Sequence, residues 1–398
     1  MKNIHIQMNA RPPLFSLEDP FKVKDATTQV KSIWKWGSDN LLPDALTALS
    51  RSSTIHRRIL NDKADYIAGR GFTLEDQNPT LEFFINSANG QGESLRWVVS
   101  RIAFDKTLFG NAFLEVVTDQ QGTLISIYHQ DATKCRLAKD SQHVVLHHNW
   151  RNYTPQHAKV LPLYPNFELQ KDGTLRSVIH YKDYEPDFEH YGVPKYIAAI
   201  QAATIAYKAD RWNISRLDNA FQPSGVMVLD GEVDSSEEAQ EIASFAEAKF
   251  AGKPGQVMFM VKNGVDGDTT KFVPITSEND GDWQDLHSQA MGDIIIAHSW
   301  FRTLSGIDYS TGFSSDRIQY EFDIAMNLVI SGEQREILEP LITLLEHQTH
   351  TDCSSLQFVN KPPFNSKPDY LYVWEARRDD GLPYDSEDPK QMIYLKNI

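Results

Sequence analysis

The chain has 398 residues, of which 41% are hydrophobic, 11% aromatic and 23% charged, and this composition excludes wholesale disorder. A formal net charge of -15 argues against a tight nucleic-acid binder, which needs Lys and Arg for the phosphates, although DNA can still slide along such a surface. Two cysteines, Cys135 and Cys353, indicate a reducing compartment, and without a signal peptide or an apolar membrane segment we expect a soluble protein made in a cytoplasm.

The first half of the chain predicts a single α+β domain over residues 34–193. Residues 1–33 are mixed in character and predict an arm with little structure. Apolar residues then recur at helical spacing after Asp39 and again over Leu95–Phe109, where Gly110 ends the helix. Short strands follow, separated by turn residues, at Ala112–Val117, Leu124–Tyr128, His143–His147 and Val178–Tyr181.

A long helix is predicted over residues 194–221, between Pro194 and Pro223. Four of its apolar residues recur at every seventh position, namely Ile200, Tyr207, Ile214 and Phe221. Such a stripe has to be buried against another surface, within the chain or on a neighbouring copy.

Residues 222–279 predict a compact α/β insertion. A helix at about Ser235–Phe250 is expected between strands, which are predicted at Val226–Leu229, Gln256–Val261 and Lys271–Ile275. Glu237, Glu238 and Glu241 lie near the start of that helix, where acidic residues complement the helix dipole. A docking face for a basic partner is the alternative interpretation.

Two further helices are predicted in the last third of the chain. The first covers residues 280–302, with Trp283, Ile294 and Phe301 in its apolar pattern, and a loop with two glycines follows over 303–315. The second covers residues 316–347, where Pro340 predicts a kink. Residues 348–398 form a Pro-rich tail with short strands expected at Leu356–Val359 and Leu371–Trp374.

Motifs for catalysis are absent from the sequence. It contains no phosphate-binding G-x-x-x-x-G-K-[ST], no G-x-S-x-G, no H-E-x-x-H and no C-x-x-C. His143, His147 and His148 on one strand favour a half-exposed polar strand over a metal site, because an acidic or Cys partner is lacking nearby. The pairs Asp266/Asp268 and Asp280/Asp282 resemble fragments of a calcium loop but lack its bidentate Glu, which favours turn or capping roles.

Several short stretches, in this order, resemble the portal protein family of tailed phages and gene-transfer-agent particles. In that family an α+β domain is followed by a long helix, a small α/β insertion, a second long helix, a loop and a third long helix. The stretches that carry the resemblance are Trp36-Gly37 with Asn40 and Pro43, Ile67–Phe72, Leu108–Phe113, Tyr191–Pro194, Phe221–Val226 and Glu339–Leu341. One departure is Asn219-Ala220, where the family usually has Asn-Gly. The resemblance covers roughly residues 34–347.

The resemblance implies an α+β portal fold that forms a ring. Its parts are an arm (1–33), an α/β wing (34–193), stem helices (194–221 and 280–302), a clip (222–279), a tunnel loop (303–315), a long kinked wing helix (316–347) and a crown or tail (348–398). It also implies a ring of about twelve copies at one vertex of the virion capsid, assembled in the host cytoplasm, through which DNA is packaged and ejected. No enzymatic activity, cofactor, metal or membrane is expected.

The resemblance assigns roles to particular residues. The tunnel loop would face DNA, binding it weakly and without sequence preference, through Ser305, Gly306, Asp308, Tyr309, Ser310, Thr311 and Gly312. The clip would dock the terminase large subunit and later a head–tail adaptor through Glu237, Glu238 and Glu241. Stem and subunit packing would use Ile200, Tyr207, Ile214, Phe221, Trp283, Ile294 and Phe301.

The wing would contact the major capsid protein or a scaffold, and Trp34 and Trp36 would pin the N-terminal arm to a neighbouring subunit. The acidic excess of the segments Asp280–Arg302 and Asp316–His347 would repel phosphates, so that DNA passes without being trapped. Two alternatives remain open, another ring-forming head–tail connector and a hydrolase or nuclease with an unrecognised site.

Overall fold

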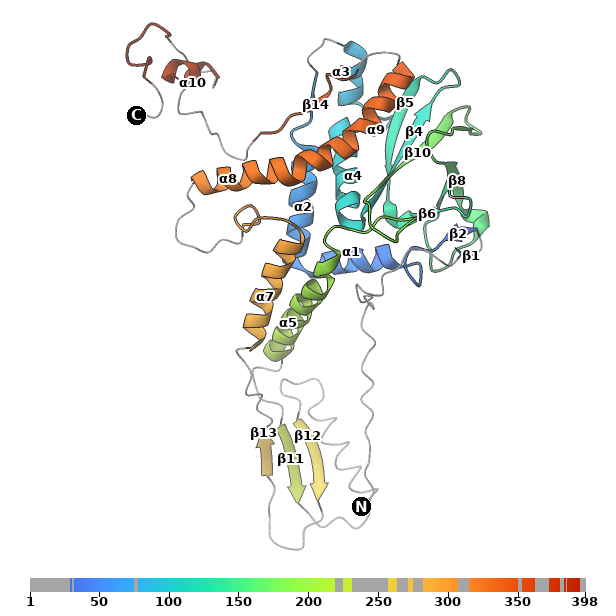
Figure 1. Ribbon diagram of the computed structural model, residues 1–398. Helices are drawn as coiled ribbons and strands as arrows, with labels where there is room; N and C mark the ends of the chain where they lie inside the picture. Colours follow the sequence, from blue (N-terminus) through green and yellow to red (C-terminus); the bar gives the residue numbers. More distant parts are fainter. Residues whose placement is uncertain are drawn as a thin grey trace.

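The structure is a computed structural model of the chain, shown in Figure 1. It describes residues 29–30, 32–74, 78–218, 225–230, 257–262, 271–274, 282–306, 315–349, 353–361, 372–379, 383 and 385–393.

The body of the molecule is a layer of helices packed against a four-stranded antiparallel sheet (Figure 1). The helices are α1 (Leu42–Ser52), α2 (Thr54–Ala68), α3 (Pro79–Asn86) and α4 (Leu95–Phe109). The sheet has the order β5-β4-β10-β9, with strands β4 (Asn111–Thr118), β5 (Leu124–Gln130), β9 (Glu168–Leu169) and β10 (Leu175–Lys182). Every residue of β4 is buried, so this strand lies at the centre of the core. The predicted helix over Leu95–Phe109 and the strand that follows it are confirmed.

A second, smaller sheet adjoins the body and has the order β6-β7-β8. Its strands are β6 (Cys135–Leu137), β7 (His143–Leu146) and β8 (Lys159–Pro162), of which the sequence predicted only β7. A strand pair, β1 (Gln29–Val30) and β2 (Ile33–Trp34), lies beside it, and Ile33 bridges to Ala138. The end of the predicted arm is therefore attached to the body. Three-residue 3₁₀ turns occur at Ala132–Lys134, Pro155–His157 and Ile197–Ala199.

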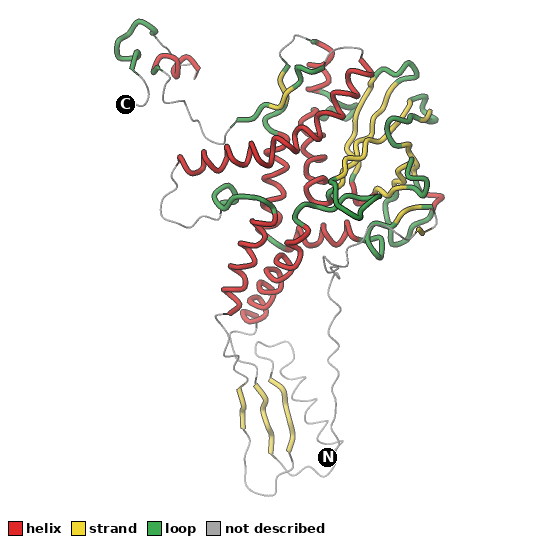
Figure 2. The backbone as a smooth tube through the Cα atoms, in the orientation of Figure 1, coloured by secondary structure: helices red, strands yellow, loops and turns green. Residues whose placement is uncertain are grey.

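Two helices, α5 (Ile200–Asp218) and α7 (Asp282–Ala297), pack side by side and project from the body (Figure 2). After the buried Ile200 at its start, the buried face of α5 consists of alanines, which allow the two helix axes to approach closely. These alanines are Ala202, Ala203, Ala206 and Ala209. Of the predicted stripe of larger residues, Ile200 is buried within the chain, Tyr207 is half-buried and Ile214 is exposed.

Beyond the free ends of α5 and α7 lies a three-stranded sheet of order β12-β11-β13 (Figure 1). Its strands, β11 (Gly225–Asp230), β12 (Val257–Lys262) and β13 (Lys271–Pro274), match the three predicted ones. Strands β11 and β12 are parallel, and a parallel pair needs a crossover connection. The predicted crossover helix, Ser235–Phe250, lies outside the described residues.

The last long helix runs as α8 (Ser315–Ala325), a π-helical turn (Met326–Ile330) and α9 (Ser331–Thr349). The helix bends between α8 and α9 (Figure 1), and π turns are a recognised cause of bends. Pro340 lies inside α9, and the kink expected there stays a prediction.

The segment after α9 attaches to the body through a short strand pair, through hydrogen bonds between Asn360 and Gln334, and through the buried Leu356. Strand β14 (Gln357–Phe358) pairs with β3 (Phe72–Thr73). The strand predicted at Leu371–Trp374 is wrong, because the helix α10 (Val373–Asp379) begins there. Among the described helices, none combines the length and apolarity needed to cross a membrane.

Candidate functional site

Two glycine-containing motifs that carry the family resemblance meet in space. Gly110 ends α4 in the left-handed conformation, with φ 66°, and Gly192 lies against it. A Cβ on Gly192 would lie 2.2 Å from the carbonyl oxygen of Gly110. The Asn111 side chain locks this crossing, because its Nδ2 donates to the Gly192 carbonyl and its Oδ1 accepts from the Gly192 N–H, both at 2.8 Å. The crossing joins the body to the segment that leads into α5.

A buried cation lies beside this crossing and joins three parts of the chain. The Lys106 ammonium on α4 is 2.5 Å from Asp183, which follows β10, and 2.6 Å and 2.7 Å from Glu333 and Glu336 on α9. Lys195, just before α5, also pairs with Glu333. These ion pairs connect the body both to the segment just before α5 and to α9.

Electrostatics explain why Lys106 stays charged. Burial alone would lower the pKa of Lys106, but the Asp183 and Glu333 carboxylates outweigh it and raise that pKa above its ordinary value. Burial likewise opposes the charge on Glu333, and Lys106 and Lys195 lower the pKa of Glu333 nonetheless. Asp183, Glu333 and Glu336 are close enough to hold a metal ion, but the Lys106 ammonium already occupies the position between them.

A pair of buried histidines joins α2 to the end of α7. His56 Nδ1 and His298 Nε2 are 2.8 Å apart, and the Tyr196 ring stacks on His298. Lys63 Nζ donates to the His298 carbonyl at 2.5 Å. Burial lowers the pKa of His56 to about 3 and holds the pKa of His298 well below its usual range. Both imidazoles are therefore neutral at pH 7.

Glu321 on α8 fixes the start of the predicted tunnel loop. Its carboxylate accepts from the Thr303 N–H at 3.1 Å and from the Thr303 hydroxyl at 2.9 Å, and Arg317 donates to the same carboxylate at 3.2 Å. Gly306 is exposed with φ 71°, a conformation that favours glycine. The two ends of the loop are thus held close together.

The loop assignment needs one correction. Ser305 was predicted to face DNA, but its side chain is buried and its hydroxyl donates to the Phe301 carbonyl at 2.9 Å. That prediction is wrong because Ser305 belongs to the packed turn after α7. The other predicted DNA-facing residues after Gly306 lie outside the described residues, namely Asp308, Tyr309, Ser310, Thr311 and Gly312.

The predicted packing residues of the helix pair divide into two groups. Ile200 and Ile294 are fully buried within their own chain, so they cannot contact a neighbouring subunit. Tyr207 and Phe301 are half-buried, whereas Ile214 is exposed. Phe221 and the side chain of Trp283 lie outside the described residues, as do the clip residues Glu237, Glu238 and Glu241.

Trp34 and Trp36 pack within their own chain. Trp36 is buried and stacks on Tyr191 with ring centroids 4.6 Å apart, while Trp34 stacks on His190 at 3.9 Å. The prediction that Trp36 pins the arm to a neighbouring subunit is therefore wrong, because its ring is enclosed in the core. His143, a candidate metal ligand, is half-buried and instead pairs with Asp140 and Glu168.

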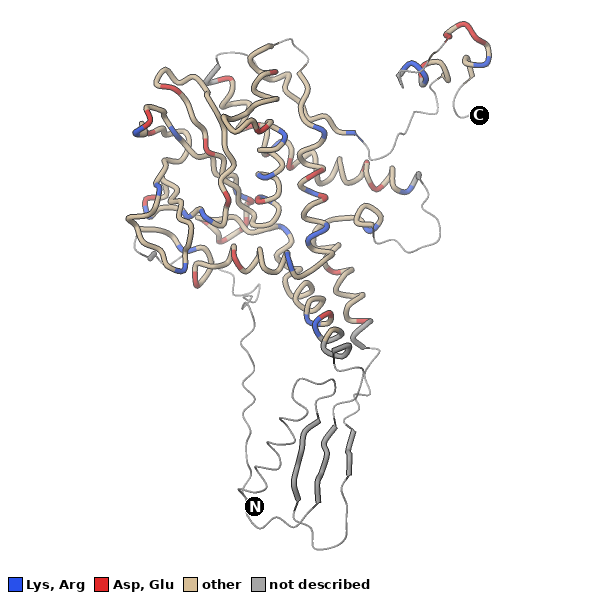
Figure 3. Tube along the Cα trace, turned by 180° about the vertical axis from the view of Figure 1, so that it is seen from behind, with Lys and Arg blue, Asp and Glu red and all other residues tan. Residues whose placement is uncertain are grey.

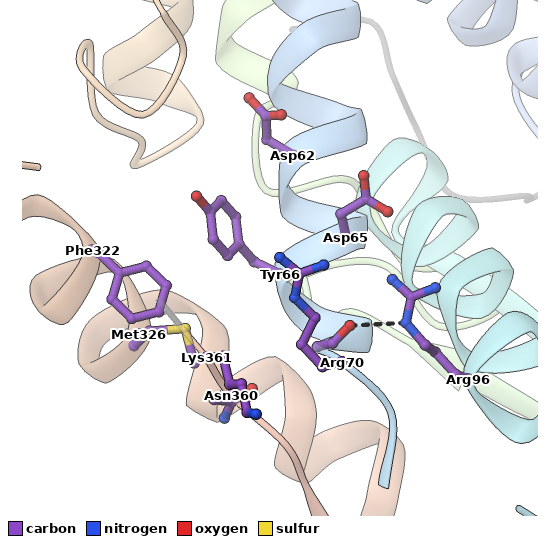
Figure 4. Close-up of a pocket in the computed structure, with 10 residues that line it drawn as sticks. Asp62, Asp65, Tyr66, Arg70, Arg96, Phe322, Met326, Asn360 and Lys361 are labelled. Carbon is purple, nitrogen blue, oxygen red and sulfur yellow. Dashed lines mark hydrogen bonds between the residues drawn. The ribbon is translucent and has the colours of Figure 1, made fainter. Parts of the chain in front are cut away.

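One surface cavity of about 280 Å³ opens between α2, α8 and the segment after β14 (Figure 4). Charges of both signs line it: Asp62, Asp65, Arg70, Arg96 and Lys361. Arg96 already donates to the Gly69 carbonyl at 2.9 Å. With both signs present, the cavity favours neither an anion nor a cation.

Sequence reasoning missed the buried polar residues, although spacing offered a signal for some of them. Lys106 follows Ile102 and precedes Phe109 on the apolar face of α4, and Lys63 lies between Ile59 and Ile67 on that of α2. A cation at the centre of an apolar stripe indicates a buried partner. The identity of that partner, which is 227 residues away in the case of Glu333, has no local signal.

Comparison with known proteins gives consistent similarities. Residues 71–298 match the family model described as "Phage portal protein". An uncharacterized protein of Rickettsia bellii (strain RML369-C) is 28% identical over 162 residues, which are 39% of each of the two chains. The chain thus spans well under half the length of that relative.

Two solved structures have a similar fold. One is titled "Virion of native gene transfer agent (GTA) particle", with 17% identity, a TM-score of 0.53, and coverage of 86% of this chain and 94% of the other. The second is titled "Neck of native GTA particle computed with C12 symmetry", with 16% identity, a TM-score of 0.53, and coverage of 92% and 98%. At these identities the likeness shows the fold alone.

Proposed function

Because the chain belongs to the phage portal protein family, we propose that it forms a closed ring of about twelve copies whose central channel conducts double-stranded DNA during packaging and ejection. The observation that carries this proposal is the family match over residues 71–298, which runs from the body through both projecting helices and the sheet inserted between them. The ring would occupy one vertex of a virion capsid after assembly in a host cytoplasm.

Exposed apolar side chains on the projecting helices and on the last long helix support a ring. Ile214 on α5 is 56% exposed, Ile296 on α7 is 75% exposed, and Leu328 in the π turn is 78% exposed. Large apolar side chains gathered on a few elements indicate a contact surface. In a ring, neighbouring copies would cover them.

The proposed parts of the subunit follow the family order. The body would be the wing, α5 and α7 the stem, the β11–β13 sheet the clip, and α8 to α9 the long wing helix. The acidic balance of the chain, -15 overall, would keep DNA from adhering to the channel. The wing would face the major capsid protein or a scaffold, and the clip would dock the terminase large subunit and then a head–tail adaptor. We expect no catalysis and no cofactor.

The loop over residues 303–315 would be a mobile constriction around DNA. Its anchored start at Thr303 and Glu321 supports this role, because the constriction needs a firm base. Asp308→Lys should place one positive charge per subunit in the channel and make DNA passage slower and salt-dependent. Packaging at the wild-type rate at all salt concentrations would show that Asp308 does not approach DNA.

The oligomeric state tests the proposal directly. Native mass spectrometry and negative-stain imaging of the purified chain should give closed rings of about twelve subunits with an axial channel. A chain that stays monomeric or dimeric at high concentration would overturn the proposal and leave a hydrolase or nuclease as the alternative.

A further inference from the structure

The exposed faces of α5 and α7 carry opposite charges. On α5, Lys208 and Arg211 are exposed, three residues apart, and so lie on one face of the helix. Lys208 follows the buried Ala206 by two positions, which places that face roughly opposite to the one packed on α7. Figure 3 shows this basic character on α5. The helix pair thus presents these two cations on its outer side.

The exposed face of α7 is acidic. Helix α7 contains three Asp and neither Lys nor Arg, and Asp285 and Asp293 are exposed. Red marks this helix in Figure 3, beside the blue of α5. Among the described residues, no ion pair joins Lys208, Asp285 or Asp293 to another group. The one described ion pair between the two helices uses other residues, His287 and Asp210, at 3.3 Å.

Exposed apolar side chains also lie beside the charges on each of the two helices. Ile205 and Ile214 flank the basic pair on α5, and Leu286 and Ile296 lie among the aspartates on α7. Both faces therefore have the composition of a contact surface, in which apolar residues supply the area and charges set the partner.

We propose that the basic face of α5 in one copy of this chain binds the acidic face of α7 in the next copy. The α5 face comprises Ile205, Lys208, Arg211 and Ile214, and the α7 face comprises Asp285, Leu286, Asp293 and Ile296. Since each copy has one face of each sign on the two sides of its helix pair, every contact is the same and head-to-tail, and such contacts close under rotation. The inference deepens the proposed ring and rests on it.

Charge reversal on either face should weaken the ring, because two like-charged faces then meet. In Lys208→Glu with Arg211→Glu, and in Asp285→Lys with Asp293→Lys, the concentration for half-assembly should rise on the order of tenfold or more. High salt should partly restore assembly of both variants by screening the repulsion. Arg151→Glu with Lys171→Glu makes the same change in net charge as the Lys208→Glu, Arg211→Glu variant, but on exposed loops of the body, and should assemble like the wild type.

A mixture of the two reversed variants gives the sharpest test. The acidic α5 of the first fits the basic α7 of the second, and the unchanged faces fit equally well. Mixed in equal amounts at low salt, the two should form rings that native mass spectrometry finds to contain an even number of subunits and equal numbers of each variant. Assembly of the mixture also shows that both variants fold.

The outcomes separate this inference from the ring itself. If the wild type forms rings and both variants assemble as well as it does, the charged faces do not meet, while the proposed portal ring stands. If only the Asp285→Lys, Asp293→Lys variant assembles normally but slows DNA passage, the acidic face lines the channel and the inference is overturned. A monomeric wild type contradicts the proposed function instead.

Discussion

Lys106 is a buried cation whose charge depends on carboxylates from two other parts of the chain. Its side chain is only 3% exposed, and a buried ammonium group of this kind needs carboxylate partners. Burying one charge is costly, and attraction to Asp183, Glu333 and Glu336 offsets that cost. Through this network one side chain of α4 contributes to holding α9 on the body.

Lys106→Met should lower the free energy of unfolding by about 3–5 kcal/mol, because it leaves carboxylates buried without their cation. Urea unfolding at matched protein concentration measures the loss. The control is Lys134→Met, which removes a half-exposed lysine 3.4 Å from Asp131 and should cost no more than about 1 kcal/mol. Equal losses for the two variants would contradict the network.

The His56–His298 pair makes stability depend on pH. The pKa of His56 is about 3 in the folded chain against 6.5 for an unperturbed histidine, and that of His298 is also well below 6.5. Between about pH 3 and pH 6.5 the unfolded chain binds more protons than the folded chain. The free energy of unfolding is therefore highest, as far as these histidines are concerned, above pH 6.5 and falls as the pH is lowered. Arg57 and Lys63 face the pair and further oppose its protonation.

From pH 7 to pH 5 the free energy of unfolding should fall by about 2 kcal/mol through His56, and His298 acts in the same direction. His180, whose pKa burial also lowers to about 3, adds to the same slope. His56→Gln should be less stable at pH 7 yet show a smaller loss between pH 7 and pH 5 in urea unfolding. His157→Gln, at an exposed site, should keep the wild-type slope. An unchanged slope in His56→Gln would show that His56 protonates in the folded chain.

Among the elements, the crossing of Gly110 and Gly192 decides how the projecting helices attach. The last turn of α4 and the segment entering α5 approach so closely that only glycines fit. Asn111 then ties the two backbones together with two hydrogen bonds. The direction in which α5 leaves the body is therefore fixed by backbone contact.

Gly192→Ala should lower the free energy of unfolding by about 3 kcal/mol or more, because its Cβ would meet backbone atoms of Gly110 and Asp183 that cannot move aside. Gly332→Ala is the matched control in α9, where nothing lies within 4 Å of the added Cβ. Helix propensity predicts that the control is neutral or gains up to about 1 kcal/mol. Thermal unfolding compares the two, and a tolerated Gly192→Ala would mean that the crossing can widen.

In the whole molecule, the surfaces proposed for ring assembly and those proposed for docking lie on different parts. The charged faces of α5 and α7 belong to the helix pair, whereas the β11–β13 sheet lies beyond its ends (Figure 2). A change in the clip should then spare the ring. Glu237, Glu238 and Glu241 are the proposed docking residues of that part.

Reversing Glu237, Glu238 and Glu241 to Lys should leave ring size unchanged and reduce DNA packaging or tail joining, because a basic partner would be repelled. Native mass spectrometry checks the ring, and protected DNA per particle checks packaging. Particles that package DNA and join tails normally would show that these glutamates form only a solvated helix face.

The sequence by itself determined the order of the long helices and of the inserted strands, and the bounds of the elements with strong periodicity. Helix α4 begins and ends where its apolar spacing and Gly110 predict, and the three strands of the inserted sheet match theirs. These features are local, since they depend on residues within a few positions of one another.

Only the tertiary structure decided which residues meet across the chain. His56 and His298 are 242 positions apart, and Lys106 and Glu333 are 227 apart, so no spacing could pair them. The bend at Met326–Ile330, and the burial of Ser305 and Trp36, arise in the same way. Packing against distant elements selects the backbone geometry and exposure of each residue, and a local pattern carries no information about those elements.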